Sequence, residues 1–297
     1  MAGIVVVGSI NLDLILPCAR IPRPGETLHA HARELAPGGK GANQAVAAAR
    51  LGGDVAMVGA VGDDTFAEPA LALLSDAGVD LTHVRRVQGA TGLAVVYVDD
   101  AGENSILIEG GANRSVDADA VRAAAAVVEA ADVVVLQGEI PRSGIEAAAE
   151  LTRGRLLVNL APVIDVSPDV LRRADPLVVN EHEGSLALRM LGQQADGDDA
   201  VVAALLEAGV PAVVMTRGAK GALVGRPDQT TEVGSPRVEV VDTTGAGDAF
   251  VGALATRLVA GDDLVDAATF AARVGAFACT GRGAQPSYPR SGDTLPS

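Results

Sequence analysis

A carboxylate follows directly on a glycine turn in Asp242-Thr243-Thr244-Gly245-Ala246-Gly247-Asp248. The apolar segment after the turn predicts a helix to about Val259, whose first N–H groups have no intrahelical partner. Gly245 and Gly247 let the backbone approach an anion closely at this helix N-terminus. Asp248 suits a general base that takes the proton from a hydroxyl attacking phosphorus. The alternative is that Asp248 only complements the helix dipole.

Two other glycine-rich turns have a similar character. Gly38-Gly39-Lys40-Gly41-Ala42-Asn43 opens an alanine-rich helix expected over Gln44–Leu51, so bare backbone again lies at a helix N-terminus. Thr216-Arg217-Gly218-Ala219-Lys220-Gly221 follows an apolar strand. The sequence has no P-loop pattern, and no Gly-x-Gly-x-x-Gly follows the first strand, so the two commonest nucleotide-binding motifs are absent.

Asn11 and Asp13 stand two residues apart in a segment that alternates polar and apolar residues. In a strand, both side chains would therefore project from the same face. A paired amide and carboxylate suit the hydroxyl groups of a sugar. The alternative is two polar residues on a solvated strand edge.

Short apolar runs alternate with helical segments along most of the chain, which predicts an α/β fold with a doubly wound, mainly parallel sheet flanked by helices. Apolar residues make up 48% of the sequence but aromatics only 2%, so the core must consist of Ala, Val and Leu. The expected strands are 3–8, 55–61, 132–136, 156–159, 177–180, 212–216 and a short run at 240–241. The expected helices are 65–77, 117–130, 143–151, 181–191 and 199–208.

Polar residues stand at the carboxyl ends of these strands, where ligands collect in such sheets. They are Gln137, Glu139, Asn159, Asn180, Glu183 and Thr216. Each one alone is more often a cap or turn residue than part of a site.

Two excursions interrupt the strand and helix alternation, one over 11–36 and one over 91–110. Each reads as a hairpin, the second with Asp99-Asp100-Ala101-Gly102-Glu103 at its turn. We expect the two to pair as a small separate sheet that serves as a lid. The whole chain, 1–297, is then a single domain with a discontinuous lid.

The formal net charge of −15 argues against nucleic acid and anionic membrane as partners. The N-terminus lacks a basic region followed by a long apolar segment, and no apolar run reaches membrane-spanning length, so a cytoplasmic protein is expected. Cys18 and Cys279 have no metal-ligand spacing and are expected to be reduced thiols.

In combination, these motifs resemble the ribokinase-like family of sugar and nucleoside kinases from Gly8 to Pro289. The resemblance rests on Gly-Ser-Ile-Asn-Leu-Asp at 8–13, Gly-Gly-Lys-Gly-Ala-Asn-Gln-Ala at 38–45, Gly-Glu-Asn at 102–104, Gly-Ala-Asn at 111–113, the spacing of Asn180 and Glu183, and the segment 242–248. It implies a kinase that uses ATP and Mg²⁺ to phosphorylate the 5-hydroxyl of D-ribose. Family members pair through the lid, so the resemblance also implies a homodimer.

The resemblance also assigns roles to residues. Asp248 would be the base and Gly245, Ala246 and Gly247 the anion hole. The sugar would be held by Asn11, Asp13, Gly39, Lys40, Gly41, Asn43 and Glu139. Asn180 and Glu183 would face the nucleotide phosphates and Mg²⁺, and Thr216, Arg217, Gly218, Ala219, Lys220 and Gly221 the nucleotide.

The late turn 279–287 is similar to the potassium-binding loop of the family. The matching positions are Asp242, Thr244, Ala278, Gly281, Gly283 and Ser287. A large, weakly hydrated cation accepts many carbonyl oxygens and a carboxylate, so K⁺ is expected as an activator. The alternative is a glycine turn that merely closes a helix.

Other functions remain compatible with the sequence. A kinase of the same family could act on deoxyribose, a hexose, a ketosugar acid or a nucleoside. A sugar-binding sensor without catalysis is the alternative from another class, against which the intact Asp248 and its glycine turn argue.

Overall fold

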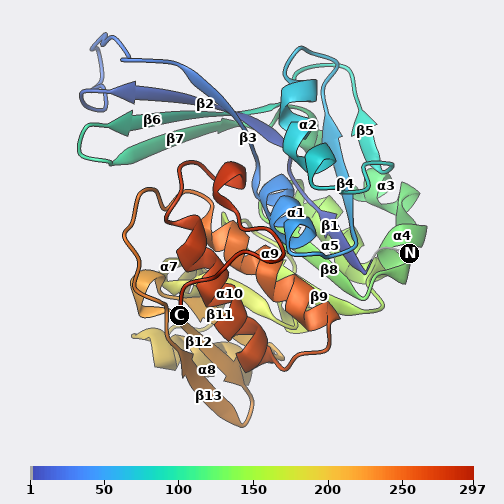
Figure 1. The fold of residues 1–297 in the computed structure, drawn as a ribbon. Helices are drawn as coiled ribbons and strands as arrows, with labels where there is room; N and C mark the ends of the chain where they lie inside the picture. Colours follow the sequence, from blue (N-terminus) through green and yellow to red (C-terminus); the bar gives the residue numbers. More distant parts are fainter. Residues whose placement is uncertain (1–2) are drawn as a thin grey trace.

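The computed structural model describes residues 3–297, which form two β-sheets and the helices around them (Figure 1). The strands of the main sheet are β1 (Ile4–Val7), β4 (Val55–Val61), β5 (Val84–Arg86), β8 (Val133–Gln137), β9 (Arg155–Asn159), β10 (Leu177–Asn180), β11 (Val213–Thr216), β12 (Ala222–Arg226) and β13 (Gln229–Val233). Their order is β13-β12-β11-β10-β9-β8-β1-β4-β5. Neighbours from β11 to β5 run parallel, and β12 and β13 extend the sheet antiparallel.

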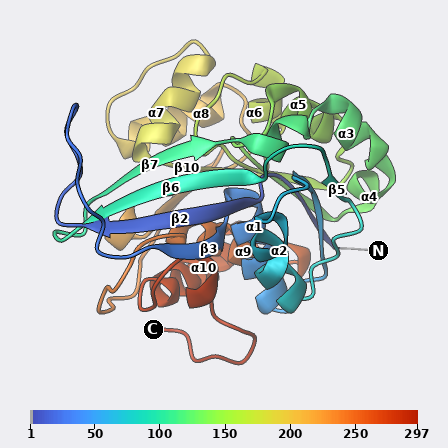
Figure 2. The ribbon, with the colours of Figure 1, turned by 90° about the horizontal axis from the view of Figure 1, so that it is seen from above.

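Helices cover both faces of this sheet (Figure 2). On one face lie α1 (Lys40–Arg50), α2 (Ala67–Asp76), α9 (Ala246–Val259) and α10 (Leu264–Ala278). On the other lie α3 (Ala118–Ala123), α4 (Ala125–Ala130), α5 (Arg142–Leu151), α6 (Pro168–Arg173), α7 (Glu181–Met190) and α8 (Asp198–Glu207). Alternate strand residues enter opposite cores, as Val6 does on one face and Val5 on the other. The predicted doubly wound α/β fold is therefore confirmed.

The chain reverses its direction of travel across the sheet at β1. From β1 it first adds β4 and β5 on one side, and from β8 onward it builds the other side. A crevice forms beyond the carboxyl ends of adjacent strands at such a point, because the following connections leave in opposite directions. In this chain the adjacent strands are β1 and β8.

The small sheet consists of β3 (Glu34–Gly38), β2 (Asn11–Cys18), β6 (Gly92–Asp99) and β7 (Asn104–Glu109), in that order. Both sequence excursions contribute to it, because β2 runs parallel to β6 from the other excursion. It projects from one end of the main body in Figure 1. The predicted small separate sheet is confirmed. Residues 26–35 were expected to form the second strand of the first excursion, but that strand, β3, begins only at Glu34 and ends at Gly38.

The predicted strand at Val240 and Val241 is wrong. Both side chains are exposed, and the Val241 N–H donates to the Cys279 carbonyl outside any strand. The segment does not pair with β13 or β5, the two edge strands of the main sheet. The structure also differs from the prediction elsewhere. Helix α1 begins earlier, at Lys40, and the predicted helix 117–130 is broken at Ala124. Strands β12 and β13 were not predicted.

The segment after α10 returns to pack against α1. The Arg50 guanidinium of α1 donates to the carbonyls of Gln285 and Tyr288. The Tyr288 hydroxyl in turn donates to the Gly245 carbonyl at 3.0 Å. The late turn is thereby tied both to α1 and to the start of α9. Within residues 3–297, no helix is long and apolar enough to cross a membrane.

Candidate active site

Asp248 lies in the first turn of α9, where its side chain is buried with 6% of its surface exposed. Gly245 caps this helix with a left-handed backbone, φ 73°. A Cβ at Gly245 would lie 2.4 Å from the Tyr288 hydroxyl, so both the conformation and the space require glycine. Nothing lies within 4 Å of a Cβ built on Gly247, so the backbone there is open to a ligand. The carboxylate and an open helix N-terminus are thus adjacent.

The turn before α1 meets the turn before α9. The Asn43 Nδ2 donates to Asp248 Oδ2 at 2.9 Å, and Gln44 Nε2 donates to Asp248 Oδ1 at 2.9 Å. Gly39, with φ 88°, caps α1, and a Cβ there would lie 2.8 Å from the Asn11 nitrogen. Two predicted ligand turns, more than 200 residues apart in sequence, therefore form one site.

Glu139 follows β8 and lies against the same turn. Its Oε2 accepts hydrogen bonds from the Ser9 hydroxyl at 2.6 Å and from the Lys40 backbone N–H at 3.0 Å. The Ser9 hydroxyl also accepts from the Gly41 N–H at 3.2 Å. This arrangement lies just beyond the carboxyl ends of β1 and β8, the crevice that the sheet topology predicts.

Asn11 and Asp13 border the same space from β2. Asn11 is buried and its Oδ1 accepts from Asn113 Nδ2 at 2.7 Å. Burial, and then repulsion from Glu139 and Asp248, raises the pKa of Asp13 to about 7. A Cβ on Gly38 would overlap the Asp13 carboxylate, so the neighbouring β3 must carry glycine at that position. The structure therefore brings all the predicted sugar-holding residues to one place.

Lys40 supplies the positive charge among these carboxylates. Asp248 first, and then Glu139 and Glu183, raise the pKa of Lys40 against the opposing effect of burial. An ammonium group there balances part of the negative charge. The cluster combines a buried carboxylate, a cation and an open helix N-terminus, which is suitable for transferring an anionic group to a hydroxyl.

The predicted nucleotide residues lie on the next strands of the sheet. Asn180 caps α7, and its Oδ1 accepts from the Glu183 N–H at 2.8 Å while Glu183 Oε2 accepts from the Asn180 N–H at 2.9 Å. Burial raises the pKa of Glu183. Thr216 is the register partner of Asn180 in the adjacent β11. The turn 216–221 closes through a 2.7 Å bond from the Arg217 N–H to the Gly221 carbonyl.

The residues predicted to hold a monovalent cation also gather in one place. Asp242 accepts from the Thr244 N–H at 2.9 Å and from the Gly283 N–H at 2.8 Å, and so joins the two loops. Burial raises the pKa of Asp242, but the bonds from Thr244 and Gly283 outweigh it, and the net shift is downward. A Cβ on Gly281 would lie 2.8 Å from the Ser287 Cβ, and the Gly281 N–H donates to the Ala278 carbonyl at 3.3 Å.

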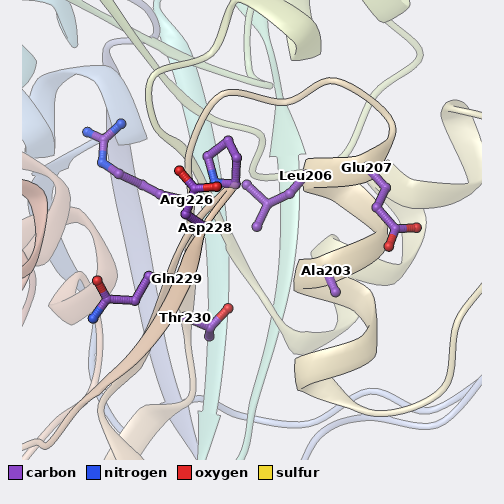
Figure 3. Close-up of a pocket in the computed structure, with 8 residues that line it drawn as sticks. Ala203, Leu206, Glu207, Arg226, Asp228, Gln229 and Thr230 are labelled. Atoms are coloured by element: carbon purple, nitrogen blue, oxygen red, sulfur yellow. The ribbon is translucent and has the colours of Figure 1, made fainter.

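A separate surface hollow of about 450 Å³ lies between α8 and the turn joining β12 to β13 (Figure 3). Its lining comprises Ala203, Leu206, Glu207, Arg226, Pro227, Asp228, Gln229 and Thr230. None of these is a predicted site residue. The charged ones, Glu207, Arg226 and Asp228, are of both signs. The hollow is therefore distinct from the cluster around Asp248.

Several residues take part in the site without a predicted role. Ser9 orients Glu139, Asn113 orients Asn11, and Gln44 contacts Asp248. Gln285 Nε2 donates to Asn43 Oδ1 at 3.0 Å, and Tyr288 holds Gly245. Ser9, Gln44 and Asn113 fall inside the motifs that carried the resemblance, so their place in the sequence was a signal. Gln285 falls inside the late turn 279–287, although no role was predicted for it, and nothing in the sequence pointed to Tyr288.

Comparison with known proteins identifies the chain's relatives. A model of the pfkB family of carbohydrate kinases matches residues 1–291. A ribokinase of Schizosaccharomyces pombe is 37% identical over 303 residues, covering 97% of this chain and 95% of the relative. A deoxyribokinase of Salmonella typhi is also 37% identical, over 291 residues, covering 96% of this chain and 95% of the relative.

A solved structure has the same fold. The ribokinase of Arabidopsis thaliana, determined with ribose and ATP, superposes with a TM-score of 0.86 at 32% identity. The match covers 98% of this chain and 96% of the other.

The raised pKa of Asp13 makes stability depend on pH in a defined direction. Between about pH 4 and 7 the folded chain holds a proton that the unfolded chain releases, so the free energy of unfolding falls as pH rises. Asparagine does not ionise, so Asp13→Asn removes this pH-dependent decrease in the free energy of unfolding. We expect the variant to gain on the order of 1–3 kcal/mol over the parent at pH 8, and less at pH 5.5. Urea unfolding at both pH values measures the difference.

The matched control is Glu103→Gln, which neutralises an exposed carboxylate. It should change stability by less than about 0.5 kcal/mol at either pH. An equal gain for Asp13→Asn at pH 5.5 and 8 would show that Asp13 does not titrate in this range.

Proposed function

The chain belongs to the pfkB family of carbohydrate kinases, and from this we propose that it transfers the terminal phosphoryl group of ATP to the 5-hydroxyl of D-ribose. The products are D-ribose 5-phosphate and ADP. The observation that carries the proposal is the meeting of buried Asp248, Lys40 and the open N-terminus of α9 at the switch point of the sheet.

The reaction requires one proton transfer and one in-line displacement. Asp248 removes the proton from the sugar hydroxyl, whose oxygen bonds to the terminal phosphorus while the bond from that phosphorus to the bridging oxygen of ADP breaks. The N–H groups of Gly245, Ala246 and Gly247 then face the charge that develops on the phosphoryl oxygens. Because this donor set is backbone, it adds no net charge to the site.

The sugar lies between the small sheet and α1 in this proposal. Asn11 and Asp13, on β2, form hydrogen bonds with the sugar hydroxyls. Glu139, which follows β8, also forms a hydrogen bond with a sugar hydroxyl. Gly39, Lys40, Gly41 and Asn43 contribute from the turn that opens α1. Residues 11–36 and 91–110 act as a lid that excludes water when the sugar is bound.

The nucleotide lies along the turn 216–221, with its phosphates directed toward Asn180 and Glu183. Mg²⁺ is the usual cofactor of this ATP-dependent family. It is held by few carboxylates together with substrate phosphates and water, and half-buried Glu183 offers such a carboxylate. When bound, the ion neutralises charge on the phosphates. An enzyme with these substrates is expected in the cytoplasm, which cell fractionation can test.

2-Deoxyribose is the second candidate substrate. The deoxyribokinase relative is as similar to this chain as the S. pombe ribokinase is. A comparison of kcat/KM for the two sugars separates these candidates, and a screen with hexoses and nucleosides extends it. A sensor without catalysis would bind sugar but release no ADP.

Asp248→Asn tests the assignment of the base. The amide keeps the shape of the side chain but cannot accept the proton, so kcat should fall by about 10²- to 10⁴-fold. ADP release with ribose measures turnover, and calorimetry should show that ATP still binds. Near-parental turnover in a folded variant would contradict the role of Asp248.

A monovalent cation site beside the anion hole is a further part of the proposal. Asp242 and Ser287 side chains, with backbone carbonyls at Thr244, Ala278, Gly281 and Gly283, would hold K⁺. The clustering of these loops around Asp242 supports the fit. When bound, the ion supplies a fixed positive charge that orders the carbonyls around Thr244. The N–H groups of residues 245–247 then keep their direction.

Replacing tetramethylammonium by potassium at constant ionic strength should raise activity if this site operates. Asp242→Ala should remove most of that rise, because the carboxylate that joins the two loops is lost. Steady-state rates in the two salts, measured for parent and variant, provide the test. Equal rates of the parent in both salts would exclude the cation from the mechanism.

We also propose that the lid pairs two subunits. β7 is an edge strand of the small sheet with every residue exposed, and Ile106, Leu107 and Ile108 are apolar. An apolar edge with free backbone groups favours pairing with a second copy.

Leu107→Lys should convert the dimer to monomer, because a charge would enter the paired surface. Sedimentation at micromolar concentrations measures the assembly. Val259→Lys is the matched control, since Val259 is a partly exposed apolar residue at the end of α9. A parent that sediments only as a monomer would refute the pairing, and so would a Leu107→Lys variant that stays dimeric.

A further inference from the structure

Three buried carboxamide side chains form a hydrogen-bonded cluster that includes Asp248. Gln44 and Gln137 are each 1% exposed and Asn159 is 8% exposed. Gln44 Nε2 donates to Asp248 Oδ1 and to Asn159 Oδ1, both at 2.9 Å. Gln137 Nε2 donates to Gln44 Oε1 at 2.7 Å. Gln44 thus joins Asp248 to the carboxyl ends of β8 and β9.

These contacts fix which way the Gln44 amide faces. Its nitrogen has two hydrogens, and each has an oxygen partner on a different element. Its oxygen has the Gln137 donor. The reverse orientation would place an oxygen against the Asp248 and Asn159 oxygens, so only one orientation is satisfied.

Close helix packing brings Gln44 within reach. Gly252 lies one turn after Asp248 in α9, and a Cβ there would lie 2.6 Å from the Gln44 carbonyl and from the Ala47 Cβ. Glycine at 252 therefore sets the distance between α1 and α9. On the strand side, a Cβ at Gly8 would overlap the Gln137 amide oxygen. Glycine is therefore required next to Gln44, at position 252, and next to Gln137, at position 8.

We propose that Gln44 is a positioning residue that holds the Asp248 carboxylate in the orientation needed to accept the sugar proton. Gln44 bonds one carboxylate oxygen and Asn43 the other, so rotation about the Cβ–Cγ bond is blocked. A carboxylate has about four acceptor positions, so these two hydrogen bonds leave it able to accept the sugar proton. Gln44 is buried and does not touch substrate. The inference rests on the proposed role of Asp248 as the base.

Gln44→Met tests the inference, because methionine keeps the length of the side chain but has no N–H group. We expect kcat to fall by about 10- to 100-fold, since small errors in placement have effects of this size. The KM values for ribose and ATP should stay within about threefold of the parent. Thr152→Val is the control for a lost buried hydrogen bond, because Thr152 lies in the core and donates to Ala148 far from the site.

The decisive measurement combines Gln44→Met with Asp248→Asn. If Gln44 acts through Asp248, adding Gln44→Met to Asp248→Asn should change kcat by less than about twofold. A structural effect on the whole site would lower kcat by the same factor in both backgrounds.

Gln137→Leu gives a second route should Gln44→Met fold poorly. It releases the Gln44 oxygen without touching Asp248, so we expect a smaller fall, about 3- to 10-fold in kcat, again absent in the Asp248→Asn background. The inference is overturned if Gln44→Met keeps parental kcat, if it raises KM alone, or if its loss persists with Asp248→Asn. Parental turnover of Asp248→Asn itself would instead overturn the proposed base.

Discussion

The burial of negative charge is the constraint on which this site depends. Asp13, Glu139 and Asp248 share one space, and burial, followed by repulsion from the other two carboxylates, raises the pKa of Asp13. A chain with a net charge of −15 gives little general compensation. Compensation must be local, and it comes from Lys40, from backbone N–H groups at the start of α1, and from amide side chains. The chain has two lysines, Lys40 and Lys220, and both lie in glycine turns at predicted ligand positions. Both lysines therefore lie where an anionic substrate would bind.

Helix packing with small residues makes this local compensation possible. A side chain at Gly252 would push α1 away from α9, and the amides of Asn43 and Gln44 would lose contact with Asp248. Alanine at 45, 47 and 48 keeps the rest of the interface thin. The scarcity of aromatic residues fits the same requirement, because large rings would separate helices that must lie close. The small residues of α1 and α9 thus set the distance between the two helices, and this distance lets the amides of α1 reach Asp248.

The sequence predicted those parts of the site that depend on local backbone. Glycine turns at helix starts can be recognised in the sequence itself. The same holds for polar residues at the ends of apolar strands. The three turns, the main sheet and the small sheet were all foreseen on that basis. The contacts of Gln285 and Tyr288 were not, because they join residues more than 40 positions apart through a loop of irregular backbone. The failed strand at Val240 shows the same limit: its residue types favour a strand, but a strand also needs a pairing partner, and Val241 instead donates its N–H to the Cys279 carbonyl.

The choice of neutral amides behind Asp248 has a chemical reason. A lysine or arginine in the place of Gln44 could hold the carboxylate equally firmly, but a paired cation weakens a carboxylate as a proton acceptor. Amide groups provide direction through hydrogen bonds while adding no charge. Lys40 instead carries positive charge and interacts with Asp248, Glu139 and Glu183 together. The groups that fix the orientation of Asp248, the Asn43 and Gln44 amides, are therefore separate from Lys40, the group that balances charge in the site.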